Sequence, residues 1–270
     1  MPTRAFRLAY DGRPYSGFQR QPDVPTVEDA LFDALRDLDV LAGDADTPPN
    51  YAAAGRTDAG VSALAQTVAF EAPAWLTPAA FNGTLPAAVR AWASADVSEG
   101  FHATRDATRR TYRYHCYAPT LDDGRVRAAL DRLGGEHDFH NCTTDDDGTV
   151  RRLETGCRRD GDFLVLTLSA GGFARHMVRR IVSLVRAVGC GASDLDRIDR
   201  VLGPDPIDGA AGVATAPATP LVLADVTYPN VGFEPDPDAV ESARGVFDER
   251  RVTAMTAARV VDDLRGGIGE

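Results

Sequence analysis

The stretch Ala53-Ala54-Gly55-Arg56-Thr57-Asp58-Ala59-Gly60-Val61 places a carboxylate and a guanidinium on a turn between two glycines, directly after an apolar run. Glycine tolerates unusual backbone dihedrals and lets a large ligand approach the chain. Asp58 is therefore predicted to stand exposed at the rim of a sheet, where functional side chains are often presented. The alternative is an ordinary turn in which Asp58 bonds its own backbone and Arg56 is a solvated charge. For this stretch taken alone, the ordinary turn is favoured.

Length and composition indicate an ordered globular protein. The chain has 270 residues, of which 44% are hydrophobic, enough for two packed subdomains or one large domain. No apolar run approaches the roughly 18 residues of a membrane helix, and the N-terminus lacks a signal peptide's apolar stretch, so a cytoplasmic protein is expected. The four cysteines form no C-x-x-C pair, and His137 with His140 lacks an H-E-x-x-H context. No metal site is predicted.

The charge of the chain is strongly acidic, with a net value of −11. Such a balance is unfavourable for contact with a phosphate backbone. Residues 101–186, however, hold 15 arginines against 12 acidic residues, so positive charge is concentrated there. The chain has no lysine, and arginine is the residue suited to bidentate phosphate recognition. An acidic surface without lysine indicates adaptation to very high intracellular salt, which screens charge repulsion.

The order of predicted elements indicates an α+β protein. In the first hundred residues, strands are expected over 4–10, 51–54, 66–71 and 89–97, with helices over 27–38 and 77–85. The second part predicts strands over 110–117, 163–169 and 222–228 and helices over 125–133 and 173–188. The last of these helices has apolar residues at 177, 178, 181, 184, 185 and 188. Beyond a linker at 232–237, the segments 239–247 and 251–264 are expected to be helical, with a packing or oligomerisation role.

Four further blocks follow the same order as in a known family. They are Tyr10-Asp11-Gly12 running to Gly17-Phe18-Gln19-Arg20-Gln21, Phe101-His102-Ala103 leading to Arg109-Arg110-Thr111-Tyr112-Arg113-Tyr114, Phe173 through His176-Met177-Val178-Arg179, and Ala214-Thr215-Ala216-Pro217 with Leu221. With the aspartate motif, they resemble the A-type tRNA pseudouridine synthases over roughly residues 3 to 229. The family commonly has tryptophan at Phe18 and histidine at Ser62.

The resemblance implies a fold and an activity. The fold is a pseudouridine synthase fold, with two pseudo-symmetric α/β halves that share a central antiparallel sheet with a cleft across it. The expected division is an N-terminal half over 1–100, a C-terminal half over 101–229 and a helical extension over 230–270. The activity is isomerisation of uridine to pseudouridine at positions 38, 39 and 40 in the anticodon arm of tRNAs. The resemblance also implies a homodimer. No cofactor is expected, since the sequence contains neither a Walker loop nor a dinucleotide fingerprint.

The resemblance also implies roles for six residues. Asp58 is the catalytic carboxylate, which either attacks covalently or stabilises and deprotonates the sugar. Arg56 fills the space that the flipped base leaves. Tyr112 stacks on the uracil, and its hydroxyl could take the C5 proton. Arg179 pairs with Asp58 and keeps it ionised. Leu221 and Arg110 are assigned to substrate binding.

Other interpretations of these residues are open at this stage. Tyr112 and Tyr114 could both be half-buried sheet aromatics, and Leu221 an ordinary core leucine. The protein as a whole could be a catalytically silent RNA-binding module. It could also be a hydrolase, which would need a second carboxylate about 5–10 Å from Asp58.

Overall fold

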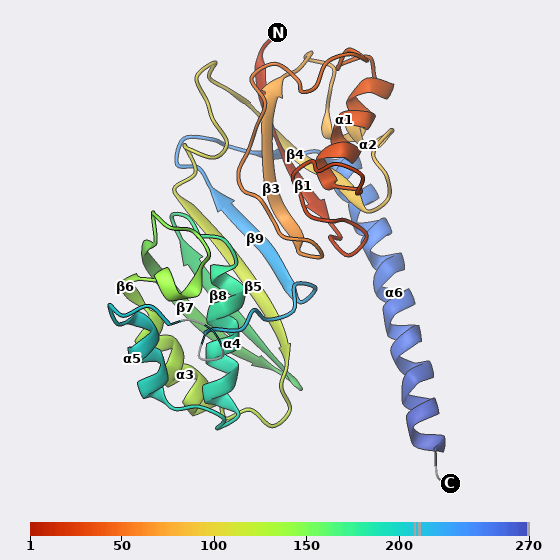
Figure 1. Ribbon diagram of the computed structural model, residues 1–270. Coiled ribbons are helices and arrows are strands. Elements are labelled where there is room, and N and C mark those ends of the chain that lie inside the picture. Colours follow the sequence, from red (N-terminus) through yellow and green to blue (C-terminus); the bar gives the residue numbers. More distant parts are fainter. Residues whose placement is uncertain (208, 210–211, 269–270) are drawn as a thin grey trace.

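The computed structural model describes residues 1–207, 209 and 212–268 (Figure 1). Its strands form one sheet in the order β10-β4-β1-β3-β9-β5-β8-β7-β6, with β2 paired to β3. Every described strand pair is antiparallel except β3 with β9. The predicted α+β class is confirmed.

The N-terminal part of the sheet packs against two helices. Its strands are β1 (Thr3–Tyr10), β2 (Ala52–Ala53), β3 (Ser62–Glu71) and β4 (Val89–Val97), and its helices are α1 (Val27–Asp37) and α2 (Pro78–Asn82). Helix α1 begins after Thr26 as predicted, because Thr26 and Asp29 form a reciprocal capping box. Apolar side chains such as Phe6, Phe70 and Phe81 fill the core between these layers.

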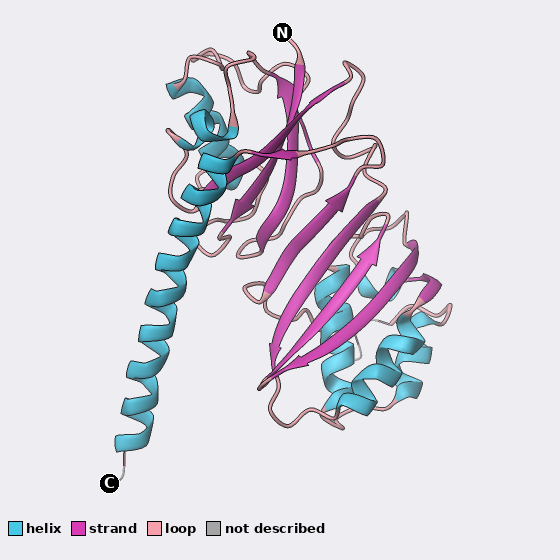
Figure 2. Ribbon diagram, turned by 180° about the vertical axis from the view of Figure 1, so that it is seen from behind, coloured by secondary structure: helices cyan, strands magenta, loops and turns pink. Residues whose placement is uncertain are grey.

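The C-terminal part repeats this arrangement with its own core. It contains β5 (Arg109–Tyr117), β6 (Gly135–Asp138), β7 (Val150–Asp160), β8 (Phe163–Ala170) and β9 (Leu221–Thr227). Helices α3 (Asp123–Leu133), α4 (Met177–Gly189) and α5 (Leu195–Leu202) lie together on one face of the sheet, with a short 3-10 helix at His140–Cys142 (Figures 1 and 2). All six apolar positions predicted to face the core from α4 are buried.

The two parts join along β3 and β9. These strands pair in parallel over only two register positions, Ser62 with Val222 and Ala63 with Leu223. The aspartate motif lies between β2 and β3, and Leu221 is the first residue of β9. The joint therefore brings the motif next to the C-terminal part. The predicted boundary between the two halves near residue 100 stays a prediction. Leu223 and Val226 of β9, which follow this boundary in the sequence, pack in the core of the N-terminal part.

Three predicted helices, one at α4 and two in the C-terminal extension, differ from the structure. The helix expected over 173–188 begins only at Met177, because His176 has a φ of 61°, in the left-handed region, which a helix cannot continue through. The two helices expected over 239–247 and 251–264 are one helix, α6 (Pro237–Gly267). The residues between them, Asp248-Glu249-Arg250, include no glycine or proline to break it.

Helix α6 follows the short strand β10 (Glu234–Pro235), and its C-terminal half extends beyond the N-terminal part of the sheet (Figure 2). The last two residues of the predicted extension lie outside the described residues. Among the helices that the structure describes, none combines the length and the apolar character needed to cross a membrane.

Candidate active site

A groove of about 1810 Å³ lies where the two parts of the sheet meet. It is bordered by the aspartate motif, by the loop after β1 and by the segment that leads into α4. All six residues predicted from the sequence line this one groove, although they come from four separate parts of the chain: Arg56, Asp58, Arg110, Tyr112, Arg179 and Leu221.

The loop that carries Asp58 is fixed through its neighbour Thr57. The buried hydroxyl of Tyr10 lies 2.7 Å from the Thr57 hydroxyl, and the amide of Phe18 donates to the Thr57 carbonyl at 3.0 Å. After Asp58 the chain turns through Gly60, whose φ is +81°, and the amide of Val61 donates to the carbonyl of Asp58. The turn therefore presents the carboxylate from a backbone held on both sides.

Two glycines of the first loop allow this close packing. A side chain at Gly12 would place its Cβ 2.0 Å from the carbonyl oxygen of Val61. Gly17 has a φ of +113° and lies beside the carbonyl of Thr57. The amide of Gly12 also donates to the Ser62 hydroxyl at 3.0 Å. The loop after β1 thus rests directly on the backbone of the aspartate motif, which only glycine permits at these positions.

The Asp58 carboxylate meets a guanidinium, as the sequence predicts. Arg179 Nη1 donates to Asp58 Oδ2 at 2.8 Å, and Arg179 Nε donates to the Ala216 carbonyl at 2.7 Å. The Asp58 side chain is 30% exposed, so the pair is open to the groove. The described contacts of the carboxylate are with the side chains of Arg179 and His176 and not with the N–H groups of its own turn. This geometry is what distinguishes it from an ordinary turn residue.

His176 is a second partner of Asp58 that the sequence analysis did not assign. Its Nε2 lies 3.7 Å from Asp58 Oδ2. The left-handed backbone of His176 ends the preceding loop just before α4, and such strained residues cluster at functional sites. The sequence does contain a feature that could have identified His176. It lies three residues before Arg179, which places both side chains near the first turn of the same helix.

Tyr112 also lines the groove. Its ring packs edge-on against the ring of Phe173, with centroids 5.2 Å apart. Burial raises the pKa of Tyr112 to about 12, and the negative charge of Asp58 adds to this, while Arg110 opposes it. The hydroxyl is therefore a neutral phenol at physiological pH. Tyr114 is buried in the C-terminal core and lines a different cavity.

Arg110 is buried and its guanidinium is committed to the backbone. Nε and Nη2 donate to the Ala54 carbonyl at 3.0 and 2.6 Å, Nη2 donates to Thr104 at 2.7 Å, and Nη1 donates to Gly171 at 2.6 Å. These bonds connect the aspartate motif, the segment before β5 and the segment before α4. The sequence analysis assigns Arg110 to substrate binding. The geometry instead favours a role in positioning these three segments.

The two remaining predicted residues differ in exposure. Leu221 is buried and borders the groove from the start of β9. Arg56 is exposed, and its side chain forms no hydrogen bond or ion pair with any residue that the structure describes. A guanidinium that has no partner among the described residues, two positions before Asp58, is available to a ligand in the groove.

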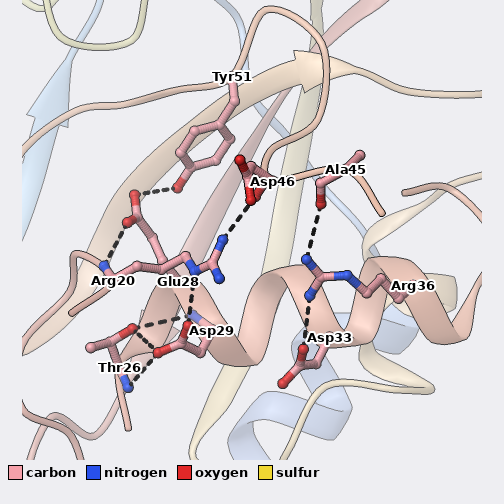
Figure 3. A network of polar contacts seen from close by, with 9 residues as sticks. All are labelled: Arg20, Thr26, Glu28, Asp29, Asp33, Arg36, Ala45, Asp46 and Tyr51. Carbon is pink, nitrogen blue, oxygen red and sulfur yellow. Dashed lines mark hydrogen bonds and ion pairs between the residues drawn. The ribbon is translucent and has the colours of Figure 1, made fainter. Parts of the chain in front are cut away.

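A polar network joins several residues that line the groove near the start of α1 (Figure 3). The Arg20 amide and the Tyr51 hydroxyl donate to the two carboxylate oxygens of Glu28 at 2.8 and 2.9 Å. The Arg20 guanidinium donates to Asp29 at 3.0 Å and to the Asp46 carbonyl at 2.9 Å. Burial and the Glu28 charge raise the pKa of Tyr51, which keeps its hydroxyl a donor. The network connects the loop before α1 and the loop after it through the start of that helix.

The groove contains enough arginine to attract an anionic ligand despite the acidic chain. The arginines that line it are Arg20, Arg56, Arg110, Arg151, Arg175 and Arg179, against five acidic residues. Arg56 and Arg175 are exposed, and neither guanidinium is paired within the described part of the chain. These two side chains are free to meet phosphate groups.

Comparison with known proteins places the chain in a family. A family model described as tRNA pseudouridine synthase matches residues 129–229. The tRNA pseudouridine synthase A of Haloarcula marismortui is 58% identical, over 98% of this chain and 100% of its own length. That of Natronomonas pharaonis is 59% identical, over 97% of this chain and 98% of its own. A solved archaeal box H/ACA sRNP Nop10-Cbf5 complex aligns with a TM-score of 0.37 at 14% identity, covering 69% of this chain and 44% of that one. The relatives confirm the expected pseudouridine synthase fold, and the chain belongs to the tRNA pseudouridine synthase A family.

Proposed function

We propose that this protein converts uridine to pseudouridine at positions 38, 39 and 40 of the tRNA anticodon arm, with Asp58 as the catalytic carboxylate. The observation that carries the proposal is the partly exposed Asp58–Arg179 pair in a groove that is also lined by Tyr112 and by arginines whose guanidinium groups have no partner among the described residues. The names of the relatives support tRNA as the substrate.

The reaction needs little beyond these groups. The N1–C1′ bond of uridine breaks, a C5–C1′ bond forms, the C5 proton leaves and N1 gains a proton, so atoms and charge balance without a redox change. A carboxylate held by a guanidinium can support the breaking bond at the sugar or the base. The neutral phenol of Tyr112 can stack on the freed ring while the ring turns.

The remaining residues fit recognition of an extruded base. Unstacking a nucleotide costs a few kcal/mol, and a side chain that fills the vacated space offsets this cost. Arg56 is exposed and unpaired within the described residues, which suits that role. Leu221 gives the pocket an apolar wall beside the carboxylate.

The proposal is tested with an unmodified tRNA transcript labelled with tritium at C5 of its uridines, because isomerisation releases that tritium into water. Purified protein is expected to release tritium from transcripts that have uridine at 38, 39 or 40, and from none when these are replaced by cytidine. Asp58→Ala should abolish release, while the exposed Glu241→Ala should not. Release by Asp58→Ala at the wild-type rate would overturn the assignment of Asp58.

The protein is further proposed to act as a homodimer in the cytoplasm of a cell with high internal salt. The acidic, lysine-free composition supports the salt adaptation. Tritium release is expected to be higher in molar KCl than in dilute buffer. Full stability and activity in dilute buffer would count against this part of the proposal.

A further inference from the structure

The first half of α6 is anchored to the N-terminal part of the sheet. The side chain of its N-cap residue, Asp236, accepts hydrogen bonds from the amides of Ala79 and Ala239, both at 3.1 Å. The amide of Asp236 donates to the carbonyl of Trp92 at 3.0 Å. Ala239 and Ala243 are buried, and the helix packs against β4 and α2 (Figure 1). This half of the helix therefore has a fixed position relative to the strands beside it.

From this anchored helix, Arg250 reaches the first residue of the loop after β1. Its Nη1 donates to Asp11 Oδ2 at 2.7 Å, and the Asp11 side chain is only 8% exposed. Arg13 donates to the same carboxylate from within the loop, with Nε at 2.8 Å from Oδ1 and Nη2 at 2.7 Å from Oδ2. Among the residues that the structure describes, Arg250 is thus the partner that connects this carboxylate to a different element.

The Asp11 carboxylate is ionised although little of it is exposed. A side-chain hydrogen bond from Arg13 lowers its pKa, burial opposes this, and the charges of Arg13 and Arg250 lower the pKa further. Removing one partner of a buried ion is costly, because part of its charge is left uncompensated. The pair of Arg250 and Asp11 therefore constrains the loop more strongly than an exposed ion pair would, since the charges of an exposed pair stay hydrated when they separate.

The loop after β1 in turn holds the aspartate motif on both sides of Asp58. The amide of Phe18 donates to the carbonyl of Thr57, the residue before Asp58, at 3.0 Å. The amide of Gly60, two residues after Asp58, donates to the carbonyl of Tyr15 at 3.3 Å. Both bonds join the backbone of the loop to the backbone of the motif. A displacement of the loop therefore displaces the carboxylate in the groove.

We propose that Arg250 is a positioning residue for the isomerisation: from α6 it holds Asp11, and through the loop after β1 it fixes the place of Asp58. The inference rests on the proposed function of Asp58 and gives the C-terminal extension a role in the same reaction. Arg250 lines a separate cavity of about 940 Å³ and is not among the described residues that line the groove. It therefore acts through the loop and not by contact with the uridine. Arg13 cannot replace it, because Arg13 belongs to the loop that has to be held.

The first test compares single variants of the full chain by steady-state tritium release in molar KCl. Arg250→Ala is expected to lose about tenfold in kcat with KM changed by no more than about twofold, because a misplaced carboxylate slows the reaction without weakening tRNA binding. Arg250→Lys should restore most of kcat, since an ammonium can replace the single contact of Nη1. Arg251→Ala is the matched control, because it removes the same charge one position later, where the guanidinium pairs with the exposed Asp248. A raised KM with unchanged kcat in Arg250→Ala, or equal losses in Arg250→Ala and Arg251→Ala, would overturn the inference.

A double-mutant cycle tests whether Arg250 acts through Asp11. Asp11→Asn removes the charge that Arg250 holds, so adding Arg250→Ala to this variant is expected to lower kcat no further. Adding Arg251→Ala to Asp11→Asn should also change nothing. If the losses of Asp11→Asn and Arg250→Ala multiply instead, the two residues act independently and the inference fails.

Hydrogen exchange followed by mass spectrometry measures the position of the loop without using activity. In Arg250→Ala, peptides that contain Phe18 or Gly60 are expected to exchange about tenfold faster than in wild type, because their amides bond across the loop and the motif. Peptides from β8 should keep the wild-type rate, and Arg251→Ala should change neither region. Faster exchange throughout Arg250→Ala would show a general loss of stability and overturn the positioning role. A wild type that shows the local pattern on comparison with Arg250→Ala but releases no tritium would overturn the proposed function and leave the connection from α6 to the motif intact.

Discussion

Arg179 holds Asp58 with one nitrogen and the carbonyl of Ala216 with another, at 2.8 and 2.7 Å. The guanidinium therefore has a fixed orientation, and it fixes the direction from which the carboxylate faces the groove. The pair connects α4 of the C-terminal part with the aspartate motif of the N-terminal part. The geometry of the Asp58–Arg179 pair therefore depends on how the two parts of the sheet are joined.

Replacing Arg179 with lysine tests whether this orientation matters beyond charge. Lysine keeps the positive charge but cannot bond Asp58 and the Ala216 carbonyl with two nitrogens of one rigid plane. We expect kcat to fall by about 10²-fold with a much smaller change in KM, because positioning acts on the reacting groups. Steady-state tritium release measures both constants. An unchanged kcat would show that charge alone suffices.

The contact between Gly12 and the aspartate motif predicts a second sensitive position. In Gly12→Ala the new Cβ would lie 2.0 Å from a backbone oxygen of Val61, so the loop has to shift. A loss of about 1–3 kcal/mol in unfolding free energy and at least tenfold in kcat/KM is expected. Gly43→Ala is the matched control, because nothing lies within 4 Å of its Cβ. Similar losses in both variants would contradict the packing role of Gly12.

The raised pKa of Tyr112 predicts how stability changes in alkaline solution. An ordinary tyrosine titrates near 10 and Tyr112 at about 12, so the unfolded chain loses this proton first as pH rises. The raised pKa of Tyr112 therefore contributes to the free energy of unfolding below pH 10, and this contribution is lost between pH 10 and 12. Tyr112→Phe should reduce the fall in unfolding free energy over this range by on the order of 2 kcal/mol. Parallel curves from urea denaturation of the two proteins would contradict the raised pKa.

The left-handed backbone at His176 allows its imidazole to be tested apart from its conformation. His176→Gly keeps the positive φ without steric cost but removes the ring that approaches Asp58. We expect the variant to be at least as stable as wild type and to lose about threefold to tenfold in kcat. Thermal unfolding and tritium release measure the two effects. A fully active His176→Gly would show that only the backbone shape matters.

Much of the fold could be predicted because local patterns there agree with the tertiary structure. Strand 89–97 has the predicted bounds, and Thr26 caps the helix that was expected to begin at residue 27. The helix expected over 77–85 is shorter, Pro78–Asn82, and Thr77 is its cap. Strand β7 was not predicted, because four arginines and two acidic residues in eleven positions hide any apolar alternation. The late start of α4 was missed for a different reason, since the left-handed backbone of His176 depends on tertiary contacts.

The candidate site could be predicted only in part for a related reason. Motif position identifies which residues belong to the site, and the structure brings all six of them to one groove. The hydrogen-bond partners of the arginine side chains are backbone oxygens that are distant in the sequence. Arg110 reaches Ala54, Thr104 and Gly171, and no spacing rule predicts that a guanidinium is used in this way.

The central claim, that Asp58 performs the isomerisation, is tested most directly by mapping pseudouridines in tRNA from cells that lack this gene and carry either wild type or Asp58→Ala. The account predicts pseudouridine at positions 38, 39 and 40 with the wild-type gene, and unmodified uridine there with the variant at equal protein level. Restored modification by Asp58→Ala would contradict it.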